Sequence, residues 1–387
     1  MITSVLTLVS LISLAGNQTF VLKVLPEQLR LKGLTAAQLT YQSLIKICCA
    51  TTLIVLSVWI LSDVIFSFKL LRNLDNFTLY TMLLAFVNVF VILNGKTLRA
   101  LGDYKYFSTL DFLPAILSLA TITIASALNL APTLYQYLHF LPRFFILALA
   151  LYFVSKTFNK LKSSSNHQLE KNVRAPGKTS LIKGSIPMLG ITISTAAIAN
   201  LDIVMLNYFS TPDKVGIYSI YVKIASVAIM ATASINSMFA PKVSALYSTQ
   251  NHSELKSYSK QVTLVTFGVA TLSTIAVLTI HQPLLEYFGT QFTEHTSALY
   301  ILFTSGLVAA FFGSVGFFLS MTGNQTAFFW IMLCAATTNA ILNYFLIPIF
   351  GLDGAAAATL VSTLISTILG TIKIKSSDGY ALVWTPK

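Results

Sequence analysis

Charged residues are scarce in this 387-residue chain, where they make up 10% of the sequence, against about 25% in a typical soluble protein. Hydrophobic residues make up 55%, and the mean hydropathy is +0.75. This composition leaves too little polar surface for a water-soluble globular protein. It excludes that class and indicates a protein that crosses a membrane several times.

The residues of metal, disulfide and nucleotide chemistry are also few. The three cysteines lie within apolar stretches, and the five histidines are scattered, so neither CxxC nor HExxH spacing is present. A Gly-rich phosphate-binding loop of the Walker type is absent too, which removes the signature of an ATPase. The sequence therefore predicts no enzyme, no cofactor and no metal site.

Apolar runs dominate what remains. The period-2 alternation of membrane β-strands is absent, so helices are the expected spanning structures. A membrane helix needs about 20 apolar residues, and we count eleven spans of about that length. They lie near residues 2–22, 43–65, 78–95, 109–130, 134–155, 184–208, 215–238, 262–285, 298–320, 327–349 and 354–374. The predicted fold class is an all-α polytopic membrane protein.

Lysine and arginine are concentrated in every second loop. Lys96 and Arg99, for example, follow the third span, whereas the opposite loops hold only Lys69, Arg72 and Lys214. Basic loops mark the cytoplasmic side, so we expect the C-terminus in the cytoplasm. We therefore interpret the net charge of +12 as a signal that orients the chain in the membrane and contacts anionic lipids. Nucleic acid is not an expected partner.

Two short similarities indicate an internal repeat. FVLKVLPEQL, at the first span, resembles FAPKVSALY, at the seventh, and aligns Lys23 with Lys242. At nearly the same offset, ALGDYKYF resembles MTGNQTAFF and aligns Gly102 with Gly323. This pattern predicts two pseudo-repeated lobes. In this register the span at 184–208 has no counterpart, so we expect a twelve-helix plan that lacks its first helix.

The predicted organisation has four parts. An N-terminal lobe of five spans covers residues 1–155, and a C-terminal lobe of six spans covers residues 184–375. Between them, residues 156–183 hold the longest hydrophilic run, rich in Ser, Lys and Asn, which is typical of a linker and is expected on the cytoplasmic side. Residues 376–387 are expected to form a short cytoplasmic tail.

Two ionisable residues lie inside neighbouring spans, where charge is costly and points to function. Lys223 is about eight residues into its span, or about 12 Å from the end at 1.5 Å per residue, which is too deep for comfortable snorkelling. Asp202 lies about six residues from the same outer end of the preceding span. Two interpretations stay open: the pair neutralise each other, or both line a cavity in which Asp202 is a proton- or cation-responsive gate.

The same stretch carries a specific pattern. It has SIP at 185–187, LD at 201–202 and VGIYS at 215–219, then the basic residue Lys223. With FAPKVSALYS at 239–248 and MTG at 321–323, this pattern resembles bacterial oligosaccharide flippases. These are the O-antigen (Wzx-type) members of the superfamily that also contains the MATE drug exporters. The resemblance covers residues 184 to about 374 well and residues 1–155 more loosely, and the absent first helix departs from the family plan.

The resemblance implies a flippase that moves undecaprenyl-diphosphate-linked oligosaccharide repeat units across the bacterial inner membrane. Its expected role is O-antigen and lipopolysaccharide assembly, with the polysaccharide polymerase machinery as a further partner. Flipping breaks no bond, so alternating access needs no nucleophile or general base. Two alternatives stay open: a related drug/cation antiporter with a smaller, aromatic and acidic cavity, or an inactive, truncated remnant with a scaffolding role.

A diphosphate requires cations, and each candidate cation has a second, structural interpretation. Arg143, near the middle of the fifth span, either contacts the diphosphate or pairs with Tyr135, Tyr137 or a freed backbone carbonyl nearby. Lys23 and Lys242 either form a pseudosymmetric pair at the cytoplasmic entrance or only follow the positive-inside rule. The candidate substrate-binding residues are thus Lys223, Arg143, Asp202, Lys23 and Lys242.

Overall fold

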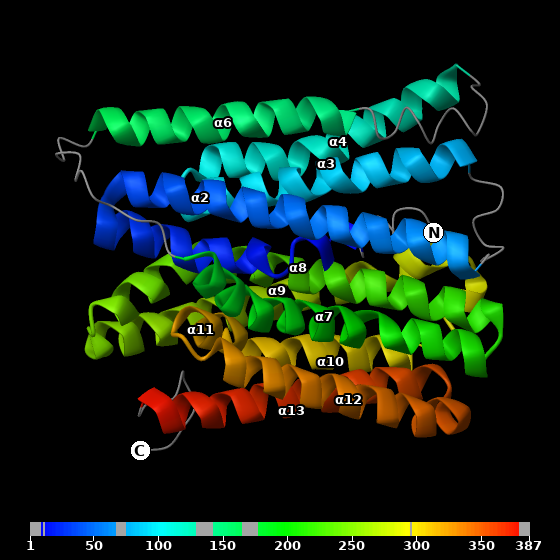
Figure 1. Ribbon diagram of the computed structural model, residues 1–387. Coiled ribbons are helices and arrows are strands. Elements are labelled where there is room, and N and C mark those ends of the chain that lie inside the picture. Colours follow the sequence, from blue (N-terminus) through cyan, green and yellow to red (C-terminus); the bar gives the residue numbers. More distant parts are fainter. Residues whose placement is uncertain are drawn as a thin grey trace. The chain divides into compact units, whose positions relative to one another are not determined.

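The computed structural model describes residues 9–10, 12–66, 75–128, 142–164, 177–294 and 296–378. Nearly all of these residues are helical, and none of them is in a β-strand (Figure 1), which confirms the predicted all-α fold class. The elements are α2 Asn17–Phe66, α3 Asp75–Ala100, α4 Tyr104–Ala127, α6 Pro142–Ser164, α7 Lys178–Phe209, α8 Pro212–Ser248, α9 His252–Phe288, the 3₁₀ turn η1 Thr290–Phe292, α10 Ser297–Phe312, α11 Val315–Met321, α12 Gln325–Phe350 and α13 Leu352–Asp378.

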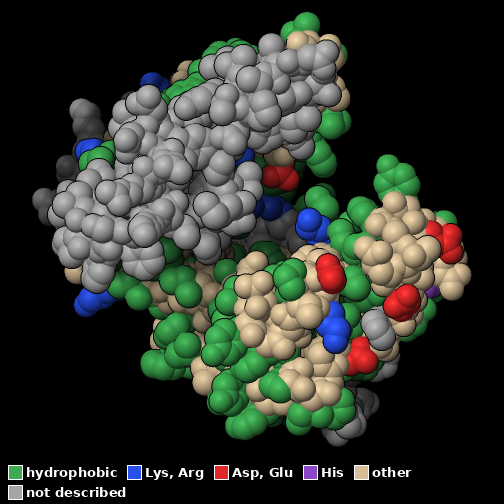
Figure 2. Space-filling view, turned by 90° about the vertical axis from the view of Figure 1, so that its right-hand side faces the viewer, with side chains coloured by type: hydrophobic (Ala, Val, Ile, Leu, Met, Phe, Trp, Pro, Cys, Tyr) green, Lys and Arg blue, Asp and Glu red, His purple; other side chains and the backbone are tan. Residues whose placement is uncertain are grey.

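Seven helical segments are long and apolar enough to cross a membrane, or eight if the bent pair α10 and α11 counts as one span. They overlap eight of the predicted spans. The predicted spans at 109–130 and 215–238 are helical as α4 and α8. Large hydrophobic side chains such as Leu272 and Ile349 are 69% and 72% exposed, and Figure 2 shows such side chains over much of the described surface. The chain is a multi-pass membrane protein.

The chain divides into two compact units, Met1–Leu189 (unit 1) and Gly190–Lys387 (unit 2). The division falls inside α7, which therefore begins in one unit and ends in the other. Helices α6 and α7 both extend into the predicted linker of residues 156–183, and residues 165–176 lie outside the described part. The lobe boundaries deduced from the sequence stay a prediction.

The first predicted span, residues 2–22, is wrong in its boundaries over the residues that the structure describes. A turn over residues 14–16 interrupts it, and α2 begins at Asn17 and continues past residue 22. That helix is in turn broken at Gly33, whose φ of 81° and ψ of −176° are not helical.

The turn before α2 has a steric cause. Gly16 has a φ of +77°, and a Cβ atom on it would lie 2.3 Å from the carbonyl oxygen of Ser185 and 2.4 Å from the amide nitrogen of Leu189. The backbone of α7 thus comes into direct contact with the chain at this glycine. Only a residue without a side chain fits both this approach and the left-handed backbone conformation.

In unit 1, α3 packs against α2, α4 and α6. Part of the core joins Leu14, Cys48, Val89 and Leu93, so Cys48 serves as a small buried apolar side chain. Its thiol also accepts a hydrogen bond from Asn17 at 3.5 Å between nitrogen and sulfur.

In unit 2, α13 packs against α12 and α10, and α8 packs against α9 and α10. The start of α13 comes very close to the end of α12, because a Cβ atom on Gly354 would lie 2.4 Å from the carbonyl oxygen of Leu346. Small residues at such crossings let membrane helices approach closely. The large core of this unit includes Tyr218 and Tyr221, both fully buried.

The two glycines aligned by the internal repeat have the same backbone conformation. Gly102 has a φ of +81° in the turn between α3 and α4, and Gly323 has a φ of +86° in the turn between α11 and α12. In both places a helix ends, a left-handed glycine reverses the chain, and the next helix begins two residues later. This agreement supports the duplicated architecture.

Candidate functional site

Asp202 is the most deeply buried acid in a spanning helix among the described residues, at 3% exposure. It lies near the end of α7, and the short turn to α8 brings Tyr218 back against it. The Tyr218 hydroxyl donates a 2.7 Å hydrogen bond to Asp202 Oδ2, and the Thr359 hydroxyl of α13 donates another at 3.0 Å. The other oxygen, Oδ1, is buried and accepts no hydrogen bond from the described residues. This carboxyl group therefore has an open oxygen for a proton or a cation.

A line of hydroxyl groups continues from this acid into unit 2. The Thr363 hydroxyl donates to the carbonyl oxygen of Thr359 at 2.8 Å. The hydroxyl of Ser305, on α10, donates to Thr363 Oγ1 at 3.0 Å. Asp202 is thus one end of a polar seam that crosses from α7 through α13 to α10.

A second buried polar group lies on α12. Asn339 and Asn343 are both fully buried and one turn apart, and Asn343 Nδ2 donates to Asn339 Oδ1 at 3.0 Å. Asn339 Nδ2 and Asn343 Oδ1 have no partner. Sequence reasoning missed this pair, although two asparagines four residues apart in an apolar span are a visible signal of a shared helix face.

Lys223, predicted near Asp202, is exposed on α8. Tyr218, which bonds Asp202, lies five residues earlier, so Lys223 projects about 140° away from it around the helix at 3.6 residues per turn. The alternative in which Lys223 neutralises Asp202 is therefore not the arrangement in the structure. Gly216 and Ser226 are exposed with Lys223, and Val227 and Met230 follow on the same helix.

Arg143, at the start of α6, joins three segments of unit 1. Its Nη1 donates a 3.0 Å hydrogen bond to Asn88 Oδ1 on α3, and Asn88 Nδ2 donates to Ser10 Oγ at 3.0 Å. Asn88 thus makes hydrogen bonds between helices, as polar residues in membrane spans commonly do. The predicted partners Tyr135 and Tyr137 lie outside the described residues.

Lys23 and Lys242 have different surroundings. Lys23 is half-buried in α2, where burial lowers the pKa of its ammonium group and the nearby Glu27 carboxylate opposes that shift. Lys242 is exposed on α8, with its Nζ 4.3 Å from the centre of the Tyr258 ring. The first lysine belongs to unit 1 and the second to unit 2, so their action as a pair stays a prediction.

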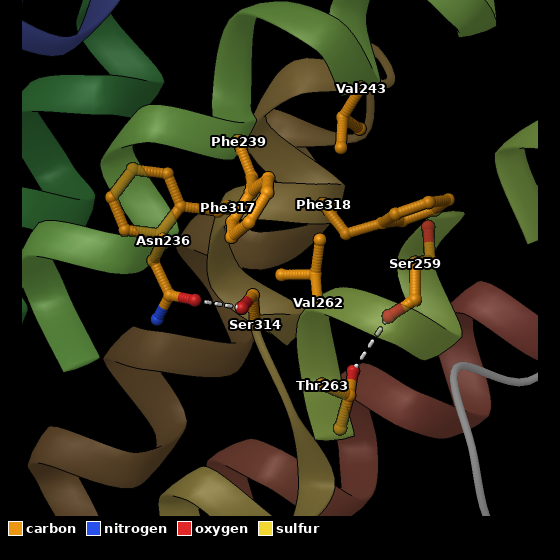
Figure 3. A pocket seen from close by; sticks show the side chains of 9 residues that line it. All are labelled: Asn236, Phe239, Val243, Ser259, Val262, Thr263, Ser314, Phe317 and Phe318. Carbon is orange, nitrogen blue, oxygen red and sulfur yellow. Dashed lines mark hydrogen bonds between the residues drawn. The ribbon is translucent and has the colours of Figure 1, made fainter. Parts of the chain in front are cut away.

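A small pocket of unit 2 lies where α8, α9 and the break between α10 and α11 meet (Figure 3). Asn236 accepts hydrogen bonds from Ser314, at the break, and from Thr266, on α9, at 3.1 Å. With a volume of about 20 Å³ the pocket holds a single water, so it is too small for a sugar. Its lining residues are Asn236, Phe239, Val243, Ser259, Val262, Thr263, Ser314, Phe317 and Phe318.

Within the described part of the chain, no group of three or more His, Cys, Asp or Glu side chains is placed to hold a metal ion. The polar groups gathered in the spanning helices are hydroxyls, amides, one buried carboxyl group and isolated cations. Such groups bind and release a solute or an ion, and they fit a passage through the membrane better than a covalent reaction.

Comparisons with known proteins point the same way. The MatE family model matches residues 187–345. A probable flippase, AglR of Haloferax volcanii, is 27% identical over 165 residues, which is 42% of this chain and 35% of the relative, so the match spans about a third of that protein's length.

Solved structures share the fold at low sequence identity. A multidrug resistance MATE transporter of the MOP superfamily, in an outward-facing conformation, is 14% identical with a TM-score of 0.75, over 96% of this chain and 86% of that one. The MATE transporter ClbM in complex with Rb⁺ is 12% identical with a TM-score of 0.70, over 93% and 83%. Residues 187–345 thus match the MatE family, and the chain has the fold of the MATE transporters, which are multi-pass membrane proteins and not enzymes.

Proposed function

We propose that this protein is a flippase that carries polyprenyl-diphosphate-linked oligosaccharides across the membrane by alternating access. The observation that carries the proposal is the sequence similarity to a probable flippase in a chain with a transporter fold. In a bacterial host the cargo is the undecaprenyl-diphosphate-linked repeat unit of O-antigen, and the membrane is the inner membrane. The C-terminus lies on the cytoplasmic side, and the polymerase that joins the repeat units receives the product.

The exposed position of Lys223 supports a hydrated passage. A lysine at the centre of a membrane helix costs about 2.5–3.5 kcal/mol when it faces lipid. Lys223 is exposed inside a predicted span, and Gly216, Ser226, Val227 and Met230 are exposed on the same side of α8. We therefore assign this face of α8 to the passage, where the ammonium group meets water and the diphosphate instead of acyl chains.

Arg143 is the candidate phosphate-binding cation of unit 1. The hydrogen bond from its Nη1 to Asn88 Oδ1, at 3.0 Å, holds the guanidinium against α3. A guanidinium presents five donors in a planar fork that matches phosphate oxygens. The sugars of the cargo need only hydroxyl and amide partners, and the lipid tail stays in the bilayer.

The test is a proteoliposome assay with the purified full chain. A fluorescent polyprenyl-diphosphate oligosaccharide is placed in the bilayer, and its transfer is followed by protection from a membrane-impermeant quencher. We expect transfer above that of protein-free vesicles, with no transfer of the same lipid lacking the diphosphate. Equal rates with and without the protein contradict the proposal.

A drug/cation antiporter is the second candidate, and Asp202 is the observation that favours it. A buried carboxyl group with an open oxygen suits coupled exchange of a solute against a proton or cation. In this case the Asp202→Asn variant abolishes dye efflux from vesicles driven by an ion gradient, while the amide oxygen still accepts from Tyr218 and Thr359. Gradient-driven dye efflux with no transfer of the lipid-linked sugar selects this candidate over the flippase.

A further inference from the structure

Two cations share one aromatic ring at the end of α3. The Arg99 guanidinium carbon lies 4.7 Å from the centre of the Phe107 ring, and Lys96 Nζ lies 5.6 Å from the same centre. Lys96 and Arg99 are one turn apart on α3, and Phe107 lies in the first turn of α4. The turn at Gly102, with a φ of +81°, folds α4 back so that this ring meets both side chains.

Arg99 is buried, and its Nε has no hydrogen-bond acceptor among the described residues. Its side chain is 6% exposed, and its Nε is fully buried without a hydrogen-bond partner. Within the described residues, the Arg99 guanidinium makes no hydrogen bond, and the group that it packs against is the Phe107 ring. A buried guanidinium without an acceptor costs several kcal/mol. The site therefore lacks a hydrogen-bond acceptor for this guanidinium, a role that an oxygen-rich anion fills.

Neighbouring acids do not fill this need. The carboxylate of Asp103 accepts a 3.0 Å hydrogen bond from Thr157. Asp111, one turn beyond Phe107, is close enough for its charge to act on Lys96 and Arg99, but it is exposed and bonds neither. Two like charges one turn apart repel each other, so an additional anion between them is stabilising.

The location of the pair selects the class of anion. Leu83–Ala100 is apolar enough to cross the membrane, and both cations lie in its last two turns. The end of a spanning helix lies at the depth of the lipid headgroups, about 15 Å from the bilayer centre. Anionic headgroups are enriched on the cytoplasmic side, which is the side that the basic loops assign to this end of α3.

We propose that Lys96 and Arg99 form a binding site for the phosphate of an anionic membrane phospholipid. The open edge of the Arg99 guanidinium binds phosphate oxygens through parallel N–H donors, Phe107 holds its plane, and Lys96 adds a point charge. This site shares no residue with the candidates Asp202, Lys223 and Arg143, and the inference does not depend on the flippase assignment.

The experiment measures lipid binding to the delipidated full chain in detergent. Short-chain phosphatidylglycerol is the probe, phosphatidylcholine is the zwitterionic control, and inorganic phosphate is the soluble control. We expect phosphatidylglycerol to bind about tenfold more tightly than phosphatidylcholine, and Arg99→Gln to lower that affinity about tenfold, which is one strong charge-assisted interaction. Lys96→Gln lowers it less. The matched control is Lys105→Gln, which removes an exposed charge from the same end of α4 and leaves the affinity within twofold.

Arg99→Lys keeps the positive charge and removes the planar guanidinium with its parallel donors. This variant is used for the same measurement if Arg99→Gln does not fold. We expect this variant to melt as the wild type does and to bind phosphatidylglycerol about threefold to tenfold more weakly, because the lysine cannot make parallel contacts. Unchanged phosphatidylglycerol binding in a folded Arg99 variant overturns the proposal. So does inorganic phosphate that competes at the concentration of the lipid, since the site then takes a soluble anion.

Discussion

The Tyr218 hydroxyl donates a 2.7 Å hydrogen bond to Asp202 Oδ2 and thereby ties the start of α8 to the end of α7. Tyr218 is fully buried and belongs to the main core of unit 2. Thr359 adds the third helix to this junction at 3.0 Å. One carboxyl group thus joins three helices, and the consequence is measurable.

Removing the tyrosine hydroxyl should destabilise unit 2. Tyr218→Phe leaves Asp202 with Thr359 as its side-chain partner, and the loss of a hydrogen bond to a buried charged group costs about 1.5–3 kcal/mol. We expect a lower melting temperature for the purified protein in detergent. Tyr208→Phe is the matched control, because Tyr208 is 84% exposed and its hydroxyl loss should leave the melting temperature unchanged. Equal melting of both variants would show that the bond contributes nothing.

Lys223 should matter for transport rather than for folding. Lys223→Ala removes an exposed cation, so we expect the protein to reach the membrane in normal amounts while transfer of the diphosphate lipid falls at least tenfold, about 1.4 kcal/mol or more in transition-state energy. Lys223→Arg keeps the charge and should retain part of the activity. The control is Lys214→Ala, which removes an exposed lysine from the first turn of α8. Full activity in Lys223→Ala removes this residue from the passage.

Arg143 and Asn88 should be energetically coupled. Hydrogen bonds between membrane helices contribute about 0.6 kcal/mol on average and up to about 1.7 kcal/mol. A double-mutant cycle with Arg143→Ala and Asn88→Ala, followed by reversible unfolding in mixed micelles, should give a coupling energy in this range. The control is a second cycle that combines Arg143→Ala with Asn200→Ala. Asn200 is exposed, and its side-chain amide donates to the carbonyl oxygen of Ala196 in its own helix. Strict additivity of the Arg143 and Asn88 changes contradicts the bridge.

Gly354 should not tolerate a methyl group. The alanine Cβ would lie 2.4 Å from the Leu346 carbonyl oxygen, and this neighbour is backbone that cannot rotate away. Gly354→Ala must therefore separate α12 from α13, and we expect a loss of about 1–3 kcal/mol from overpacking. Gly216→Ala meets nothing within 4 Å and should be neutral or slightly stabilising, because alanine favours helix. Thermal unfolding of both variants decides the point.

The sequence predicted the helical fold and two of the residues that join helices, Asp202 and Arg143, because a charge in an apolar span is rare. It could not predict their partners. Tyr218 and Thr359 lie 16 and 157 residues from Asp202, and hydroxyl groups are common in membrane helices. Lys223 was a plausible partner of Asp202 because both lie at a similar depth in their spans. In the structure, Lys223 projects from a different side of α8 than Tyr218, which bonds Asp202. The position of a residue along its helix can be predicted from the sequence, whereas its contacts with other helices depend on how the helices pack.

The two cations at the end of α3 show the same limit. Lys96 and Arg99 were interpreted as topology signals from their loop, and nothing in that pattern distinguished the buried arginine from the exposed Lys105. The ring of Phe107 that covers them comes from the next helix. The interruption at Gly16 was also hidden, because its cause is the approach of Ser185 and Leu189 from a helix far along the chain.

The continuity of α7 across the two units has a mechanical consequence. The chain passes from unit 1 to unit 2 between Leu189 and Gly190, within a helix, and Pro187 stands just ahead of that junction. A proline has no amide hydrogen and removes one rung of the helical ladder. The turn of α7 that precedes Pro187 therefore lacks one backbone hydrogen bond, and it is the part of this helix that bends most easily.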